Sequence, residues 1–155
     1  MKCAFVTGGS GFLGRNLISA LREHGYEVRA LARSELAANT VQSAGAEPVR
    51  GDLDDSEALR SGMSGCTTVF HAAAIVDDWG RYDDFYHVNV VGTDRVLAAA
   101  KEAGVKRFVY VSTEAVLIGG PPIVNADETW PLPKRPIGLY PLTKGIAEKR
   151  VLAAN

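Results

Sequence analysis

Short apolar runs alternate with amphipathic segments along most of the chain, and this alternation limits the possible folds more than any other feature. The runs have the length of strands, and the segments between them place apolar residues at helical spacing. In the first such segment Leu13, Leu17, Ile18 and Leu21 share one helical face. The predicted strands are 2–7, 26–32, 46–51, 67–73 and 106–112, and the predicted helices 12–25, 34–45, 54–65 and 85–104.

Strands that alternate with helices predict a doubly wound α/β domain, in which a parallel sheet carries helices on both faces and the crossovers are right-handed. After the fifth strand the pattern changes. Residues 114–139 contain most of the prolines and no sustained period, so we expect a long ordered loop there, of the kind that is usually functional. Helical periodicity returns from Tyr140 to Ala154.

Charge and composition exclude several classes of protein. The formal net charge is -1, with both signs mixed along the chain, so no broad basic surface for nucleic acid or anionic lipid is expected. No signal peptide and no membrane-spanning run is apparent, which predicts a soluble cytoplasmic protein. Cys3 and Cys66 lack the spacing of metal ligands, and we expect reduced structural thiols and no metal site.

Three glycines, Gly8, Gly11 and Gly14, follow the first strand in the stretch TGGSGFLGRNL and open the first helix. Glycines at this point permit a tight turn and let the backbone approach a pyrophosphate, whose charge is met by the amides of the helix start. Close packing alone is the alternative explanation. Because the stretch joins the first strand to the first helix, the sequence favours dinucleotide binding.

The form TGGxGFLG resembles the extended short-chain dehydrogenase/reductase family, and further motifs of that family follow in order. Within the family, the similarity is greatest to bacterial sequences related to 3β-hydroxysteroid dehydrogenases and dihydroflavonol reductases. The resemblance covers nearly the whole chain. The motifs are GDL at 51–53, HAAA at 71–74, NVVGT at 89–93, VYVSTEAV at 109–116 and YPLTK at 140–144.

The resemblance implies a Rossmann-type sheet that forms one NAD(P)-binding domain over residues 1–155, the amino-terminal part of a longer enzyme. Family members continue with further strands and a substrate region, so this chain is expected to be a truncated portion, a proteolytic product or a protein completed by a partner. An uncovered sheet edge would favour homo-oligomers. The residues implied to bind the cofactor are Gly8, Gly11, Phe12, Leu13, Gly14, Arg33, Asp52, Leu53, Ala72, Ala73, Ala74, Asn89, Tyr140 and Lys144.

The end of the second strand favours NADP, with NAD as the alternative. NAD enzymes usually carry an acidic residue there to hold the ribose hydroxyls. This chain has Ala32 at that position and Arg33 beside it, and a guanidinium suits a 2′-phosphate. Arg33 could also be a solvated charge, and Asp52 could cap the following helix instead of contacting adenine. His71 is expected to pack in the core.

Tyr140 and Lys144 lie four residues apart on the last predicted helix, which places them on one face. A phenol with a pKa of about 10 is a weak base at pH 7, a deficit of about 4 kcal/mol. An ammonium about 5 Å away supplies about 3 kcal/mol at an effective dielectric constant of about 20. The family pattern adds Thr113, or Ser112 beside it, as the hydroxyl that holds the substrate oxygen, and Asn89 as structural support or part of a water relay.

The resemblance implies an oxidoreductase that transfers hydride between NAD(P) and a secondary alcohol or carbonyl of a small, hydrophobic or steroid-like substrate. The alternatives are a nucleotide-sugar epimerase or dehydratase that retains its cofactor, and a dinucleotide-binding module without catalysis. Retention of Thr113, Tyr140 and Lys144 together argues against the last.

Overall fold

The computed structural model describes residues 2–119 and 122–155. The chain forms two compact units. The first contains the described residues up to Ala74 together with Arg95–Val111, and the second contains Ile75–Asp94 and Ser112–Asn155.

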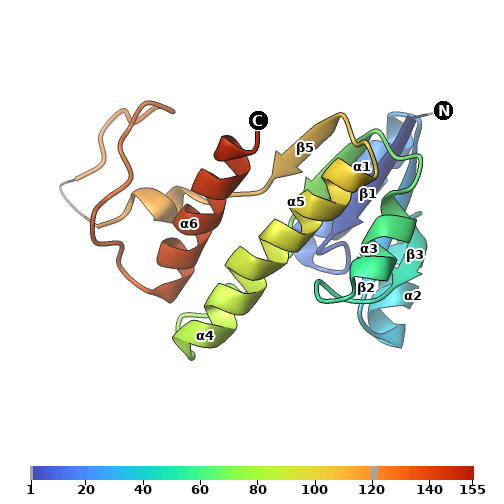
Figure 1. Cartoon of the computed structure of the whole chain (residues 1–155), viewed down its shortest axis with the longest axis horizontal. Coiled ribbons are helices and arrows are strands. Elements are labelled where there is room, and N and C mark those ends of the chain that lie inside the picture. The colour runs from blue at the N-terminus through green and yellow to red at the C-terminus, as the bar shows by residue number, and fades with distance from the viewer. Residues whose placement is uncertain (1, 120–121) are drawn as a thin grey trace. The chain divides into compact units, whose positions relative to one another are not determined.

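The first unit is built on a parallel sheet, seen among the blue to green arrows of Figure 1 together with β5. Its strand order is β3-β2-β1-β4-β5, with the reversal between β1 and β4 that is typical of a doubly wound fold. All four strand pairs are parallel, so the predicted fold class is confirmed. The strands are β1 (Lys2–Thr7), β2 (Tyr26–Ala32), β3 (Glu47–Arg50), β4 (Thr68–His71) and β5 (Arg107–Tyr110).

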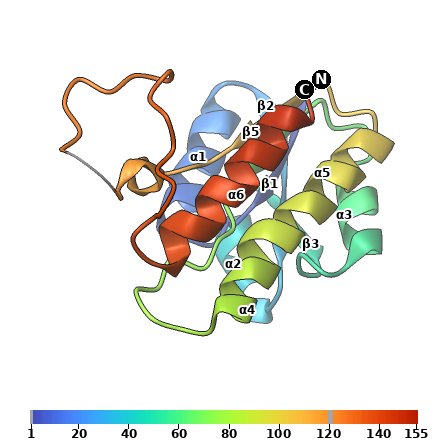
Figure 2. The ribbon, with the colours of Figure 1, turned by 60° about the vertical axis from the view of Figure 1, so that its left-hand side comes forward.

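Helices cover both faces of this sheet because the strand side chains alternate between them. Ala4 and Val6 of β1 belong to an apolar cluster with α1 (Phe12–Glu23) and α2 (Glu35–Ser43). Phe5, between them, belongs to a second cluster with α3 (Ser56–Met63) and α5 (Gly92–Glu102). Figure 2 shows α3 and α5 side by side.

The first helix begins where the sequence predicts, but its buried face is narrower. Ile18 and Leu21 are buried, whereas Leu13 is about half exposed. Leu13 lies in the first turn, beside the glycine turn and beyond the edge of the apolar cluster.

The segment predicted as a helix over 85–104 is helical as far as Glu102, but it is not α-helical throughout. It starts with α4 (Tyr82–Phe85), continues through a π-helical segment, η1 (Tyr86–Val91), and ends with α5. Sequence periodicity does not distinguish a π turn from an α turn, and such turns are frequent at functional sites. Gly104 follows the helix with a φ of 70°, as a helix-terminating glycine requires.

The second unit contains the last helix, α6 (Leu139–Ala153), within one residue of its predicted bounds at each end. Gly138 precedes it with a φ of 98°. The preceding region is not wholly irregular, because a short 3-10 helix, η2, covers Glu114–Leu117. The Ile137 amide then donates to the Ile118 carbonyl, so the two ends of the loop lie close together.

The prediction of two free thiols is wrong, because the structure joins Cys3 and Cys66 in a disulfide. Cys3 lies in β1, and Cys66 lies just before β4, which begins at Thr68. The two strands are neighbours, and their Cα atoms are 4.4 Å apart. Residues 63 positions apart in sequence meet through strand register, which spacing alone does not reveal.

Candidate functional site

The turn between β1 and α1 has the geometry that its glycines predict. Gly8 adopts a φ of 71°, and a Cβ atom there would lie 2.7 Å from the carbonyl of Ala72. A Cβ atom on Gly14 would lie 2.2 Å from the Gly8 oxygen. Gly14 therefore brings the helix close to the turn itself rather than to a strand, and any side chain would force the two apart.

The amino end of α1 is arranged to receive an anion. The Gly11 amide donates to the Gly8 carbonyl across the turn, and the first helical bond runs from Arg15 to Gly11. The amides of Phe12–Gly14 precede that bond, where a helix has no carbonyl of its own to offer them. Phe12 is 81% exposed, so the helix start is open to a ligand. A backbone cradle that a Cβ atom would fill, at the positive end of a helix dipole, fits a pyrophosphate.

The segment after β4 lies against this turn. The Ala72 amide donates to the Thr7 carbonyl, and the Ala73 amide donates to the Thr7 hydroxyl. That hydroxyl also contacts Nδ1 of His71 at 2.6 Å. His71 is fully buried, so its predicted role in core packing is confirmed.

The end of β2 carries Arg33 as an exposed residue after the buried Ala32. Ser34 caps α2, since its hydroxyl accepts the Ala37 amide, as is typical of a serine at the start of a helix. Glu35 follows, and its carboxylate pairs with Arg50. The carboxylate nearest in sequence to Arg33 is thus engaged by a second arginine, an ion pair that the sequence does not predict.

Asp52 and Leu53 follow β3 rather than end it. The Asp52 carboxylate accepts the Asp54 amide, which makes a turn, while the cap of α3 is Asp55. The alternative prediction that Asp52 caps the helix is therefore wrong. The reason is that the chain turns once more before α3 begins. Leu53 packs half-buried against the apolar cluster of α3 and α5.

In the second unit, α6 carries both members of the predicted catalytic pair. Tyr140 lies in the first turn and is half-buried, and Lys144 follows one turn later with only 3% of its surface exposed. Burial lowers the pKa of Lys144 to about 8, and the Glu148 carboxylate acts in the opposite direction. The ammonium form still outweighs the neutral form about tenfold at pH 7.

The structure gives Ser112 and Thr113 different partners. The Ser112 hydroxyl donates to the Glu148 carboxylate. The Thr113 hydroxyl accepts the Ala115 amide and thereby caps η2, and it donates to the exposed Glu114 carboxylate at 3.2 Å. The Ser112 proton is directed to a half-buried carboxylate of α6, whereas the Thr113 proton is directed to an exposed one, so Thr113 stays the better candidate for contact with a substrate oxygen.

Asn89 is buried in η1, with 1% of its surface exposed, and its amide is used for internal bonds. It accepts the Ile75 amide, and its nitrogen donates to the Ile75 carbonyl and to the Thr143 hydroxyl. This pattern supports the structural role considered for Asn89, since it fixes the residue before Lys144.

The sequence interpretation missed Glu148. Its one available signal is spacing, because Glu148 stands four residues after Lys144, as Lys144 stands four after Tyr140. The pairing of Ser112 with Glu148 spans 36 residues and has no sequence signature.

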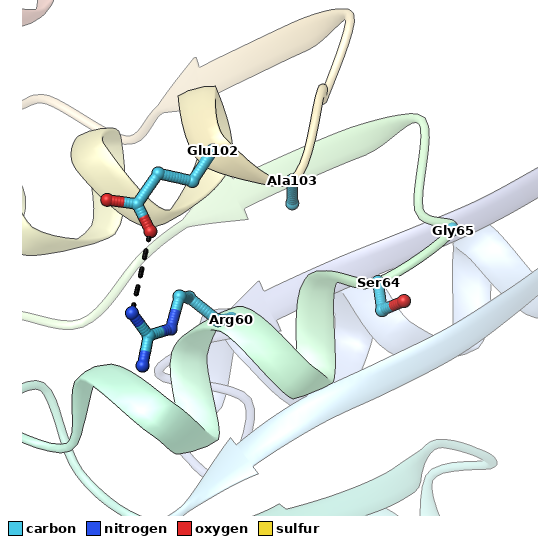
Figure 3. Close-up of a pocket in the computed structure, with 5 residues that line it drawn as sticks. All are labelled: Arg60, Ser64, Gly65, Glu102 and Ala103. Carbon is cyan, nitrogen blue, oxygen red and sulfur yellow. Dashed lines mark ion pairs between the residues drawn. The ribbon is translucent and has the colours of Figure 1, made fainter.

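A hollow of the first unit lies away from the glycine turn (Figure 3). It measures about 340 Å³ and is lined by Arg60, Ser64, Gly65, Glu102 and Ala103. Ser64 and Gly65 precede β4, and Ala103 precedes β5, so the hollow opens at the amino ends of these strands. Ligands of open α/β sheets bind at the carboxyl ends.

Residues 2–119 and 122–155 contain no group of three or more His, Cys, Asp or Glu side chains that could hold a metal ion. No helix within the same ranges is long and apolar enough to cross a membrane.

Comparison with known proteins places these features in a family. Residues 5–155 match the sequence profile of the 3-beta hydroxysteroid dehydrogenase/isomerase family. The chain is 55% identical over 151 residues to a 4-hydroxy-2-methyl-3-oxo-4-farnesyl-3,4-dihydroquinoline-1-oxide ketoreductase of Stigmatella aurantiaca, an alignment that covers 97% of this chain and 45% of the relative. The chain thus spans less than half the length of this relative.

Solved structures give the same fold with bound cofactor. A short-chain dehydrogenase/reductase superfamily protein from Agrobacterium tumefaciens, with bound NAD, matches with a TM-score of 0.81 and 36% identity over 96% of this chain and 44% of that one. MoeE5 in complex with UDP-glucose and NAD matches with a TM-score of 0.81 and 32% identity over 97% and 48%.

Proposed function

Because the chain belongs to the 3-beta hydroxysteroid dehydrogenase/isomerase family, within the extended short-chain dehydrogenases/reductases, we propose that it supplies the cofactor-binding and acid/base parts of an NAD(P)-dependent oxidoreductase. The substrate is a small hydrophobic or steroid-like molecule with a secondary alcohol or carbonyl. The observation that carries the proposal is the buried Lys144 one helical turn after Tyr140 on α6.

The residues of the glycine turn are proposed to bind the cofactor pyrophosphate, because Gly8 and Gly14 leave a cradle of backbone beside the start of α1. A bound nicotinamide would supply hydride transfer. Lys144, whose ammonium lies one helical turn after Tyr140, is proposed to assist the exchange of a proton between the Tyr140 hydroxyl and the substrate oxygen. Thr113 is proposed to orient that oxygen through its hydroxyl.

The test of this role is Tyr140→Phe, which keeps the ring and removes the proton. We expect turnover to fall by at least about 100-fold, the usual contribution of a general acid or base. NADPH oxidation is followed with a 2-alkyl-3-oxoalkanoate and a 3-oxo steroid as probes, in the full-length protein. Tyr82→Phe, at an exposed tyrosine of α4, is the matched control. Undiminished turnover in Tyr140→Phe contradicts the proposal.

NADP is proposed as the preferred cofactor, although the solved relatives named above bind NAD. Three features support the preference: Ala32 offers no carboxylate to the ribose, Arg33 is exposed beside it, and Glu35 is held by Arg50. We expect Arg33→Asp to lower the NADPH to NADH affinity ratio by at least about 10-fold, since one charge-assisted contact is lost and a repulsion is added. An unchanged ratio argues that Arg33 is only a solvated charge.

A nucleotide-sugar epimerase or dehydratase is the second candidate, because MoeE5 binds UDP-glucose and NAD on the same fold. Such an enzyme keeps its cofactor through the cycle. Cofactor that stays bound through purification favours this candidate, whereas release and turnover of added NADPH favours the reductase. A protein that binds NADPH without any turnover of either probe would be a binding module.

A further inference from the structure

Three functional groups lie at equal intervals along α6. Tyr140, Lys144 and Glu148 are four residues apart, so their side chains follow one another along one face of the helix. Tyr140 and Lys144 form the proposed acid/base pair, whereas the proposed function assigns no role to Glu148.

Glu148 connects α6 to the segment that carries Thr113. Its carboxylate accepts a hydrogen bond from the Ser112 hydroxyl, and both side chains are half-buried. Ser112 directly precedes Thr113 in the chain. A bond between a hydroxyl and a carboxylate is stronger than one between neutral groups, so it restrains both ends.

Glu148 also acts on the charge of Lys144. Burial disfavours the ammonium, and the carboxylate one turn away favours it. Other titratable groups stand on the elements that pack against α6, and three of them have partners of their own. Tyr86 of η1 and Asp94 of α5 contact Arg150, and Asp83 of α4 pairs with Arg81. The remaining titratable groups of α4, η1 and η2 are Tyr82, Asp84, His87 and Glu114.

We propose that Glu148 is a positioning residue of the reaction: its carboxylate, held by Ser112, keeps the Lys144 ammonium charged beside Tyr140 and fixes the spacing between Lys144 and Thr113. This inference rests on the proposed function, because it takes Lys144 and Thr113 as parts of the catalytic machinery. Removal of the Glu148 charge changes the charge state of a second residue, which a merely structural contact would not do.

The test measures Lys144 itself, without a substrate. The Cε chemical shift of 13C-labelled lysine is followed against pH, and the Lys144 signal is identified by its loss in Lys144→Met. In Glu148→Gln the amide keeps the shape and the bond to Ser112 but removes the charge. We expect the Lys144 midpoint to fall by about one pH unit, the effect of a unit charge about 6 Å away in a partly exposed site.

Three further variants control this result. Glu148→Asp keeps the charge and should stay closer to the parent midpoint than Glu148→Gln does. Ser112→Ala frees the carboxylate and should lower the midpoint by less than Glu148→Gln. Glu102→Gln removes the same charge from an exposed position of α5 and should leave the midpoint unchanged.

An unchanged Lys144 midpoint in Glu148→Gln overturns the inference. If Glu148→Gln fails to fold, as judged by circular dichroism, Ser112→Ala decides, and an unchanged midpoint there overturns it equally. In the full-length protein, the alkaline fall of kcat for NADPH oxidation should move with the Lys144 midpoint, and a fall that stays in place contradicts the positioning role. Retained turnover in Tyr140→Phe contradicts the proposed function instead, so the two failures are distinguishable.

Discussion

Lys144→Met should remove a pH dependence of stability that the buried ammonium creates. Burial lowers the pKa of Lys144 from 10.5 to about 8 in the folded protein, and its side chain is 3% exposed. At about 1.4 kcal/mol per pH unit, this difference corresponds to about 3 kcal/mol by which the buried charge lowers the free energy of unfolding at neutral pH.

The sign follows from proton binding. Below pH 8 the ammonium is charged in the folded and the unfolded state, so the full penalty is present. Between pH 8 and 10.5 the unfolded state keeps the proton that the folded state has released, and stability therefore increases with pH. Above 10.5 both forms are neutral and the penalty is gone.

Urea denaturation of the parent and of Lys144→Met, from neutral pH to above 10.5, measures this effect. Lysines and tyrosines remote from Lys144 titrate alike in both proteins, so their contributions cancel in the difference. We expect the stability advantage of Lys144→Met to shrink by about 3 kcal/mol across the range. Lys149→Met, at an exposed lysine of the same helix, should show a constant difference. A constant difference for Lys144→Met as well would refute the reasoning, because it would mean that the ammonium is solvated.

Two more predictions concern the turn and the buried amide. Gly14→Ala should weaken NADPH binding by more than about 10-fold in calorimetric titration, because the new Cβ would overlap the Gly8 carbonyl oxygen at 2.2 Å. The control Ser19→Ala, on the exposed side of α1, should leave the affinity unchanged. Equal affinities of the two variants would show that the helix can move without disturbing the site. Asn89→Ala should lower the free energy of unfolding by about 3 kcal/mol in urea denaturation, because the Ile75 amide and carbonyl both lose their partner, and Asn39→Ala on the exposed face of α2 should change it by less than about 0.5 kcal/mol. If Asn89→Ala lowers the free energy of unfolding no more than Asn39→Ala does, the Ile75 amide and carbonyl are hydrogen-bonded to water instead.

Local pattern was sufficient for most of the fold. The five strands, the caps at Ser34 and Gly104 and the start of α1 follow from period and from residue chemistry, because these depend on neighbours within a few positions. The π-helical segment around Asn89 and the 3-10 helix after Thr113 do not follow, since apolar spacing does not separate one kind of helical turn from another.

The same distinction between local and long-range contacts holds for the candidate site. The sequence by itself determined the glycine turn, the pair of Tyr140 and Lys144 and the exposed Arg33, because each motif lies within one turn or one helix. Only the tertiary structure decided that Cys3 meets Cys66, that Asp55 rather than Asp52 caps α3, and that Ser112 bonds Glu148 while Thr113 does not. The meeting of the cysteines and the bond between Ser112 and Glu148 join positions far apart in sequence. Strand register and helix packing set such distances, and neither leaves a period in the chain.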